Sequence, residues 1–230
     1  MNRAIPTRRE KVEARESAIL EAAHREFSEH GFEGAKVAQI AQRAGVAEGT
    51  LYLYFKNKQA LLQAVIARFY ETLTAGAAAG VADHGETFDR LEFLARYHLA
   101  ECLAEWRILE LLIGSYRSLP DYEDRGYRAL NRTYVAVFDG VLREGIARGE
   151  LREDVPLWQV RDLFYGMLEY SARTLMLRDQ AQEDLDDVVA HAIGLLRRGM
   201  ERSPGRPDRP SDLERITQRL ERVAEKLDSG

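Results

Sequence analysis

The chain has 230 residues, of which 45% are hydrophobic and 31% are charged, and its formal net charge is −5. This composition is typical of one or two folded domains and excludes a disordered or fibrous chain. The single cysteine, Cys102, excludes a scaffold of internal disulfides. No apolar run approaches about 18 residues and no apolar leader opens the chain, so we expect a soluble cytoplasmic protein without a membrane span.

The charge is distributed unevenly along the chain. Residues 1–60 contain 10 Lys and Arg against 8 Asp and Glu, whereas the remaining residues contain 23 against 30. A mildly basic head on an acidic body suits a protein whose N-terminal end meets phosphate, although an asymmetry of this size also arises by chance.

The sequence predicts an all-α fold. Only two prolines lie between Thr7 and Ser203, and no stretch alternates between apolar and polar residues with a period of two. The first helices are predicted at residues 13–30, 37–44 and 47–55, followed by a long helix from Asn57 to about residue 75. Gly31 is expected to cap the first helix. The glycine- and alanine-rich residues 75–85 are expected to form a loop between a small head and a larger body.

The body is predicted to be helical throughout. An apolar stripe over residues 88–116 indicates one helix or two in sequence, and further helices are expected at residues 121–148, 156–178 and 183–201. A proline-rich linker then precedes a capping box of Ser211 and Glu214 and an apolar heptad seam, which packs either on its own body or on a partner subunit. We divide the chain into residues 1–56, 57–201, 202–210 and 211–230.

Residues 36–58, KVAQIAQRAGVAEGTLYLYFKNK, carry the clearest motif. They predict two short helices joined by a glycine turn, with Ile40, Ala41, Val46, Leu51 and Phe55 facing inward. Such a pair presents its second helix to the major groove of DNA. Packing alone does not account for both Tyr52 and Tyr54, because at helical spacing they cannot share one inward face with Leu51 and Phe55.

The segment 17–66 resembles the N-terminal domain of TetR/AcrR-type transcriptional regulators. The resemblance rests on Ile40-Ala41, Ala44-Gly45-Val46, Gly49-Thr50-Leu51-Tyr52, Tyr54-Phe55-x-x-Lys58 and Leu61-Leu62. It implies an N-terminal three-helix helix-turn-helix DNA-binding domain, followed by a larger helical ligand-binding and dimerisation domain.

The resemblance also implies which residues meet a double-stranded DNA operator: Lys36, Glu48, Gly49, Thr50, Tyr52, Tyr54 and Lys58. Thr50, Tyr54 and Lys58 would contact phosphate, while Glu48 could accept a hydrogen bond from a cytosine amino group. Lys36 stands where the family usually has Thr or Ser, so a helix cap is lost but a phosphate contact is gained. Arg8, Arg9 and Lys11 are expected to precede the first helix and either reach a minor groove or remain solvated.

For the body, the resemblance implies a homodimer formed by the last two body helices, with Trp158, Met167, Leu175, Val189, Ile193, Leu196 and Met200 at the interface. These residues could instead all belong to the monomer core. It also implies an effector pocket, for which the candidates are Tyr97, His98, Trp106, Leu109, Ile113, Tyr134, Phe138, Phe164 and Leu168. His98 could bind a ligand or be a core histidine satisfied by its neighbours. No metal or cofactor is expected.

The implied function is a homodimeric repressor released from DNA by a small apolar effector. The string LYLYFKNK is similar to regulators of fatty-acid degradation, which sense acyl-CoA; an aromatic or drug-like effector controlling an efflux or catabolic gene is the alternative. A helical dimerisation scaffold that does not bind DNA is the competing class. An enzyme is disfavoured, because the sequence lacks a Gly-x-Ser-x-Gly motif, a phosphate-binding glycine loop and a metal-spaced cluster.

Overall fold

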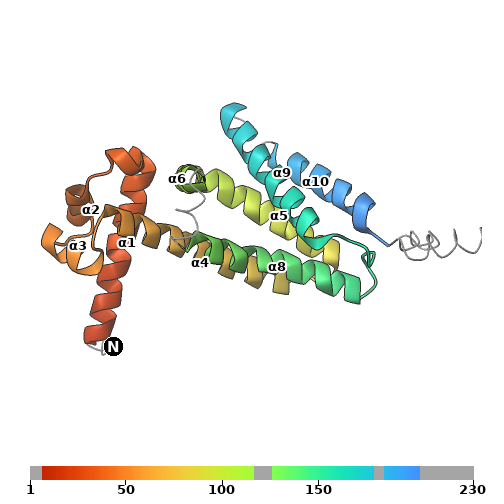
Figure 1. The fold of residues 1–230 in the computed structure, drawn as a ribbon, viewed down its shortest axis with the longest axis horizontal. Helices are drawn as coiled ribbons and strands as arrows, with labels where there is room; N and C mark the ends of the chain where they lie inside the picture. Colours follow the sequence, from red (N-terminus) through yellow and green to blue (C-terminus); the bar gives the residue numbers. More distant parts are fainter. Residues whose placement is uncertain (1–6, 117–125, 179–183, 203–230) are drawn as a thin grey trace, which may run out of the picture.

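The computed structural model describes residues 7–116, 126–178 and 184–202, and in these ranges the chain is helical without a β-strand (Figure 1). The predicted all-α class is therefore confirmed. The expected linker and C-terminal helix over residues 202–230 lie outside the described residues except for Arg202. The helices are α1 (Arg8–Gly34), α2 (Val37–Arg43), α3 (Glu48–Tyr54), α4 (Lys58–Ala82), α5 (Thr87–Ala104), α6 (Trp106–Tyr116), α8 (Tyr127–Ala147), α9 (Leu157–Arg178) and α10 (Leu185–Met200).

Helix α1 begins earlier than the apolar periodicity predicted, because a capping box at Thr7 starts it. The backbone N–H of Glu10 donates to the Thr7 hydroxyl at 3.3 Å, and the Thr7 N–H donates to the Glu10 carboxylate at 2.6 Å. Arg8, Arg9 and Lys11 therefore lie within the helix and not on an arm that precedes it. At the other end, Gly31 has φ 67° and breaks the helix where the cap was expected.

The predicted loop at residues 75–85 is wrong over most of its length, because α4 continues to Ala82. Its alanines are strong helix formers, and its glycines permit close packing. Gly76 lies against the ring of Tyr97 and Gly80 against the ring of Phe93, so a Cβ at either position would overlap an α5 side chain. Helix α4 thus runs unbroken from the head into the body (Figure 1).

In the body, helices α4, α5 and α8 run side by side, α9 packs on α5 and α8, and α10 packs on α5 and α9 (Figure 1). The apolar stripe over residues 88–116 forms two helices, which are separated at Glu105. An isolated bridge between Leu151 and Glu201 ties the start of the α8–α9 connection to the end of α10. Among the described residues, no helix is long and apolar enough to cross a bilayer.

Candidate DNA-binding and effector sites

Helices α2 and α3 form the expected helix-turn-helix. Of the residues predicted to face inward, Ile40, Ala41, Leu51 and Phe55 are buried in the core, and Val46 is half-buried against it. Gly45 turns the chain with φ 67°, and the Val46 N–H donates to the Ala41 carbonyl at 3.0 Å. These contacts hold α3 against α2 and leave the opposite face of α3 exposed to solvent.

The outward face of α3 carries most of the predicted DNA-contacting residues. Glu48 and Gly49 are exposed, Thr50 is half-exposed, and Tyr52 has 45% of its surface exposed. Gly49 has no neighbouring atom in the space that a side chain would fill, so a DNA backbone could approach it closely. Tyr54 is half-buried against the core. Sequence reasoning missed Leu53, which is the most exposed large apolar residue of the face at 84%.

The two predicted lysines differ in how they are used. Lys36 is exposed, and its backbone N–H donates to the buried Glu26 carboxylate at 3.2 Å. The ammonium of Lys58 donates to the carbonyls of Glu33 and Ala35, at 3.2 and 2.9 Å, and lies 4.8 Å from the centre of the Phe32 ring. Lys58 therefore stabilises the α1–α2 connection, a role that the sequence did not suggest.

A cluster of ion pairs connects α2 to α1. Arg43 lies 2.6 Å from Glu29 and 3.5 Å from the buried Glu26, and His30 lies 3.5 Å from Glu26. The hydrogen bond from Arg43 lowers the pKa of Glu29. Glu26, Glu29 and His30 are close enough to hold a metal ion, but the Arg43 guanidinium supplies their counter-charge.

The body contains a cavity of about 320 Å³ between α4, α5, α6, α8 and α9, here called the body cavity. Of the predicted effector residues, His98, Trp106, Leu109 and Tyr134 line it. Tyr97, Phe138, Phe164 and Leu168 do not, and the side chain of Ile113 lies outside the described residues. Phe69 and Tyr165, two further aromatic residues of the predicted body helices, also line the cavity. Sequence reasoning missed several other lining residues as effector candidates, which are Tyr70, Leu73, Cys102, Leu112, Val135 and Glu169.

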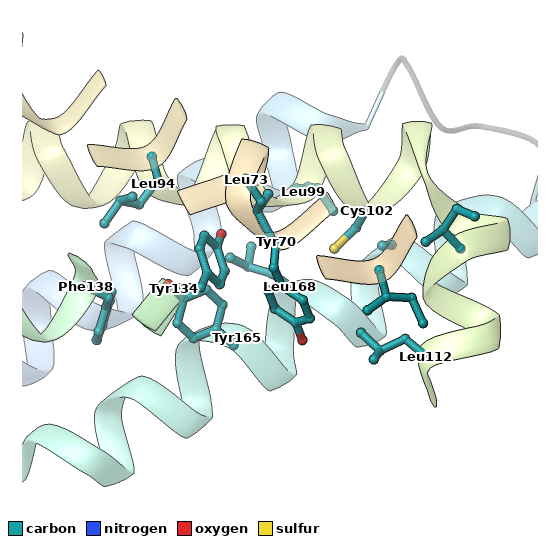
Figure 2. Close-up of a cluster of buried hydrophobic side chains, with 14 of the residues drawn as sticks. Tyr70, Leu73, Leu94, Leu99, Cys102, Leu112, Tyr134, Phe138, Tyr165 and Leu168 are labelled. Atoms are coloured by element: carbon teal, nitrogen blue, oxygen red, sulfur yellow. The ribbon is translucent and has the colours of Figure 1, made fainter. Parts of the chain in front are cut away.

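The misplaced candidates have clear packing roles. Phe138 and Phe164 are fully buried with ring centroids 4.5 Å apart, so they belong to the core behind the cavity. Tyr97 covers Gly76 and stacks on Phe93 at 5.7 Å. Figure 2 shows Tyr70, Tyr134 and Tyr165 together in the middle of the buried cluster, with Phe138 to one side and Leu112 to the other.

Buried polar groups are concentrated at one wall of the body cavity. The Nδ1 atom of His98 lies 3.0 Å from the Tyr134 hydroxyl, and its Nε2 atom lies 3.5 Å from the Cys102 sulfur. Burial lowers the pKa of His98 to about 4, so the ring is neutral at pH 7. Burial raises the pKa of the Cys102 thiol and of the Tyr165 hydroxyl well above their usual values. His98 is thus satisfied by its neighbours, as expected of a core histidine, and its ring also lines the body cavity.

Cations gather at the rim of the body cavity on α8 and α9. Arg128 and Arg132 are exposed, Asn131 is half-buried beside them, and Arg161 donates to Asp139 at 3.0 Å. Asp162 and Glu169 also line the cavity and Arg161 is paired with Asp139, so the cationic part of the rim consists of Arg128 and Arg132 on α8.

A second cavity of about 300 Å³, here called the junction cavity, lies where α1 meets α4 and α5. Leu20, His24 and Arg68 are among its lining residues, and the Nε2 atom of His24 lies 2.6 Å from the Glu105 carboxylate. Phe69 lines both cavities. This side chain of α4 is therefore part of the wall of both cavities.

The predicted dimer residues require correction. Leu175, Val189, Ile193, Leu196 and Met200 are buried within the chain because α9 and α10 turn these side chains toward α5 and each other. Only Trp158, at 61%, is well exposed, and Met167 is half-buried. The exposed apolar residues of the two helices are instead Trp158, Leu163, Tyr170, Met176, Leu177 and Leu195.

Both the head and the body of the chain match known protein families. The family model described as "Bacterial regulatory proteins, tetR family" matches residues 19–65, and the model "Tetracyclin repressor-like, C-terminal domain" matches residues 84–200. The uncharacterized HTH-type transcriptional regulator YdgC of Bacillus subtilis is 42% identical over 192 residues, which cover 82% of this chain and 93% of that protein. The chain belongs to the TetR family.

Two further similarities concern one kind of TetR-family member. The fatty acid metabolism regulator protein of Bacillus subtilis is 25% identical over 162 residues, which cover 70% of this chain and 84% of that protein. The crystal structure of FadR from Bacillus subtilis in complex with stearoyl-CoA has a TM-score of 0.68 at 25% identity, covering 78% of this chain and 96% of that one. As a TetR-family protein, the chain is a ligand-responsive DNA-binding transcriptional regulator and not an enzyme.

Proposed function

We propose that this TetR-family protein is a cytoplasmic homodimeric repressor that leaves its operator when a long-chain acyl-CoA enters the body cavity. The observation that carries the proposal is an apolar cavity with a cationic rim. Phe69, Leu73, Trp106 and Leu109 offer an apolar surface for an acyl chain. The arginines at the rim suit the phosphates of coenzyme A, which would remain near solvent. The similarity to a regulator crystallised with stearoyl-CoA supports the same ligand class.

The proposed DNA contact uses the α3 face, with Glu48, Gly49, Thr50 and Tyr52 in the major groove and Lys36 on phosphate. One such head makes few phosphate contacts, so high affinity requires two heads on two half-sites about one helical turn apart. We assign the dimer contact to the outer faces of α9 and α10. Leu163, Tyr170 and Leu177 step by seven residues along α9 and form an exposed apolar stripe.

We propose that Phe69 couples the two sites. A ligand in the body cavity would push the ring toward the junction cavity, where Leu20 and His24 of α1 lie. This displacement would loosen the contact between His24 and Glu105 and turn the head relative to the body. Because coupling is reciprocal, DNA must weaken acyl-CoA binding by the same factor.

The function is tested by fluorescence anisotropy with a labelled duplex from the region upstream of the protein's own gene. Stearoyl-CoA is added to the complex, with coenzyme A and stearate added separately as controls. We expect release by stearoyl-CoA alone, because neither part of the ligand satisfies both the cavity and its rim. Absence of release, together with no heat of binding in a calorimetric titration, would refute acyl-CoA as the effector.

The rim is tested with the double variant R128E/R132E, which should need at least about tenfold more stearoyl-CoA for release, equivalent to about 1.4 kcal/mol. Arg143→Glu is the matched control, since it reverses an exposed charge on the same helix outside the cavity.

The buried hydroxyls of Tyr134 and Tyr165 beside His98 favour an aromatic, hydrogen-bonding effector as the second candidate. Release by such a compound but not by stearoyl-CoA would select it.

A further inference from the structure

The first turns of α1 carry a stripe of basic side chains that the helix-turn-helix does not use. Arg8, Lys11 and Arg15 follow one another at spacings of three and four residues, so they share one face of the helix. All three are exposed, and none has an ion-pair partner among the described residues. We call these three residues the α1 basic stripe.

The neighbouring acidic residues do not neutralise this stripe. Glu10 is held in the capping box with Thr7, and Glu13 lies 2.7 Å from Arg9 on another side of the helix. The α1 basic stripe also lies N-terminal to residues 19–65, which the family model matches. The helix-turn-helix match therefore does not account for it.

The direction of the stripe follows from helical geometry. Eighteen residues make about five turns, so Arg8 lies on the same face as Glu26, and Lys11 on the same face as Glu29. Glu26 and Glu29 contact Arg43 of α2. The α1 basic stripe thus faces the side of α1 on which the helix-turn-helix is packed, and it begins where that packing ends.

Figure 1 shows where this surface leads. The N-terminal end of helix α1 extends beyond α2 and α3, at the side of the molecule away from α9 and α10. With α9 and α10 facing the partner subunit, the first turns of α1 point away from the centre of the dimer. Residues 8–15 span about 11 Å along the axis, which corresponds to about three phosphates of one DNA strand.

We propose that the α1 basic stripe binds backbone phosphates of the DNA that flanks each half-site, outside the base pairs read by α3. The inference rests on the proposed DNA-binding role of the α3 face. The partner is DNA because the stripe lies on the side of α1 where the helix-turn-helix packs through α2, and its charge is complementary to the phosphate backbone. The contact adds affinity without reading sequence, since phosphates carry no base information.

The test compares two duplexes that share one operator. The trimmed duplex stops at the outer edges of the inverted repeat, and the extended duplex adds about ten base pairs on each side, roughly one helical turn. The full-length protein and the triple variant R8Q/K11Q/R15Q are titrated against both by fluorescence anisotropy at several salt concentrations. Arg9→Gln is the matched control, because Arg9 is equally exposed but pairs with Glu13 on another side.

We expect the unmodified protein and Arg9→Gln to bind the extended duplex about tenfold more tightly than the trimmed one. The triple variant should bind both duplexes equally, with a salt slope on the extended duplex reduced by about 2 to 3 per subunit. Scrambling the flanking sequence should change nothing. Equal affinity of the unmodified protein for both duplexes, or a flank effect that persists in the triple variant, would overturn the inference. Failure to bind either duplex would refute the DNA-binding role as well.

Discussion

Tyr52 is the residue on which the outward face of α3 can be tested most directly. Its side chain is 45% exposed, and it is not part of the buried core between α1, α3 and α4. We expect Tyr52→Ala to weaken operator binding at least about tenfold, because it removes both a hydroxyl and an apolar surface from the DNA contact. The midpoint of thermal unfolding should stay within about 2 °C, since exposed substitutions rarely change stability. Unchanged affinity in an anisotropy titration would contradict the assigned face.

His98 makes the stability of the body depend on pH. Its pKa lies at about 4 in the folded chain against 6.5 for an ordinary histidine, so the unfolded state binds more protons between these values. The contribution of the neutral ring is complete above pH 6.5 and is lost as the pH falls toward 4. We expect about 2 kcal/mol less stability at about pH 5 than at about pH 7.5 from this group alone.

Urea unfolding of the unmodified protein and of His98→Gln at both pH values measures this effect. The difference between the two proteins removes the contributions of all other titrating groups. The variant should be less stable at about pH 7.5 because it disturbs a buried contact with Tyr134, yet it should lose less stability on acidification. Equal pH slopes would show that His98 does not titrate as described.

At the residue scale, the sequence identifies an apolar face more reliably than it identifies a cavity. His98 and Trp106 were expected in the pocket and line it, whereas Phe138 and Phe164 share the same periodicity and are core. Periodicity records which side of a helix is apolar, but a void depends on how five helices meet. Lys58 shows the same limit, because its carbonyl partners lie more than twenty residues earlier in the chain.

Gly76 and Gly80 test the packing of one element, α4. In a helix, Gly→Ala usually stabilises by up to about 1 kcal/mol. At Gly76 the new methyl group would meet the ring of Tyr97, so we expect Gly76→Ala to destabilise the protein by about 1–3 kcal/mol instead. Gly140→Ala in α8 is the matched control, because nothing lies near the position of its Cβ, and it should be neutral or stabilising. Chemical denaturation measures both, and equal signs would contradict the close approach of α4 and α5.

The same glycines explain why the end of α4 was predicted too early, at about residue 75. Glycine and alanine in residues 75–85 are typical of a loop when read locally, but here they allow two helices to touch. The α2–α3 pair was predicted correctly because its information is local: a glycine turn and five inward side chains lie within twenty residues. The signal that starts α1 is also local, because the capping box of Thr7 and Glu10 could have been recognised from the sequence.

At the scale of the whole molecule, the proposed subunit contact through the outer faces of α9 and α10 can be tested. Leu163 and Tyr170 are 68% and 67% exposed and lie on one stripe of α9. We expect L163E/Y170E to convert the dimer to a monomer, because it places two carboxylates in each half of an apolar contact. Operator affinity should fall at least about a hundredfold, since a monomer engages one half-site.

Sedimentation velocity and anisotropy together measure this prediction. Leu53→Glu is the control, because Leu53 is even more exposed but lies on α3. It should lose DNA binding and remain dimeric. A double variant that still sediments as a dimer would place the subunit contact elsewhere. The sequence could not have located this surface, because only the folded monomer shows which residues of α9 and α10 the core has already covered.

Phe69 tests whether the molecule works as one coupled unit. Its side chain lines both the body cavity and the junction cavity, so we expect Phe69→Ala to open one void toward the other and to remove the ring that a ligand would displace. We expect the variant to bind the operator normally and to bind stearoyl-CoA within about threefold of the unmodified protein, while release of DNA by the ligand is largely lost. Calorimetry measures ligand binding, and anisotropy measures release.

The control variant Leu109→Ala also enlarges the body cavity, but Leu109 does not line the junction cavity. It should therefore weaken stearoyl-CoA binding and keep release of DNA at saturating ligand. If Phe69→Ala releases DNA as fully as the unmodified protein, the signal reaches α1 by another route, such as the packing of α6 against α1.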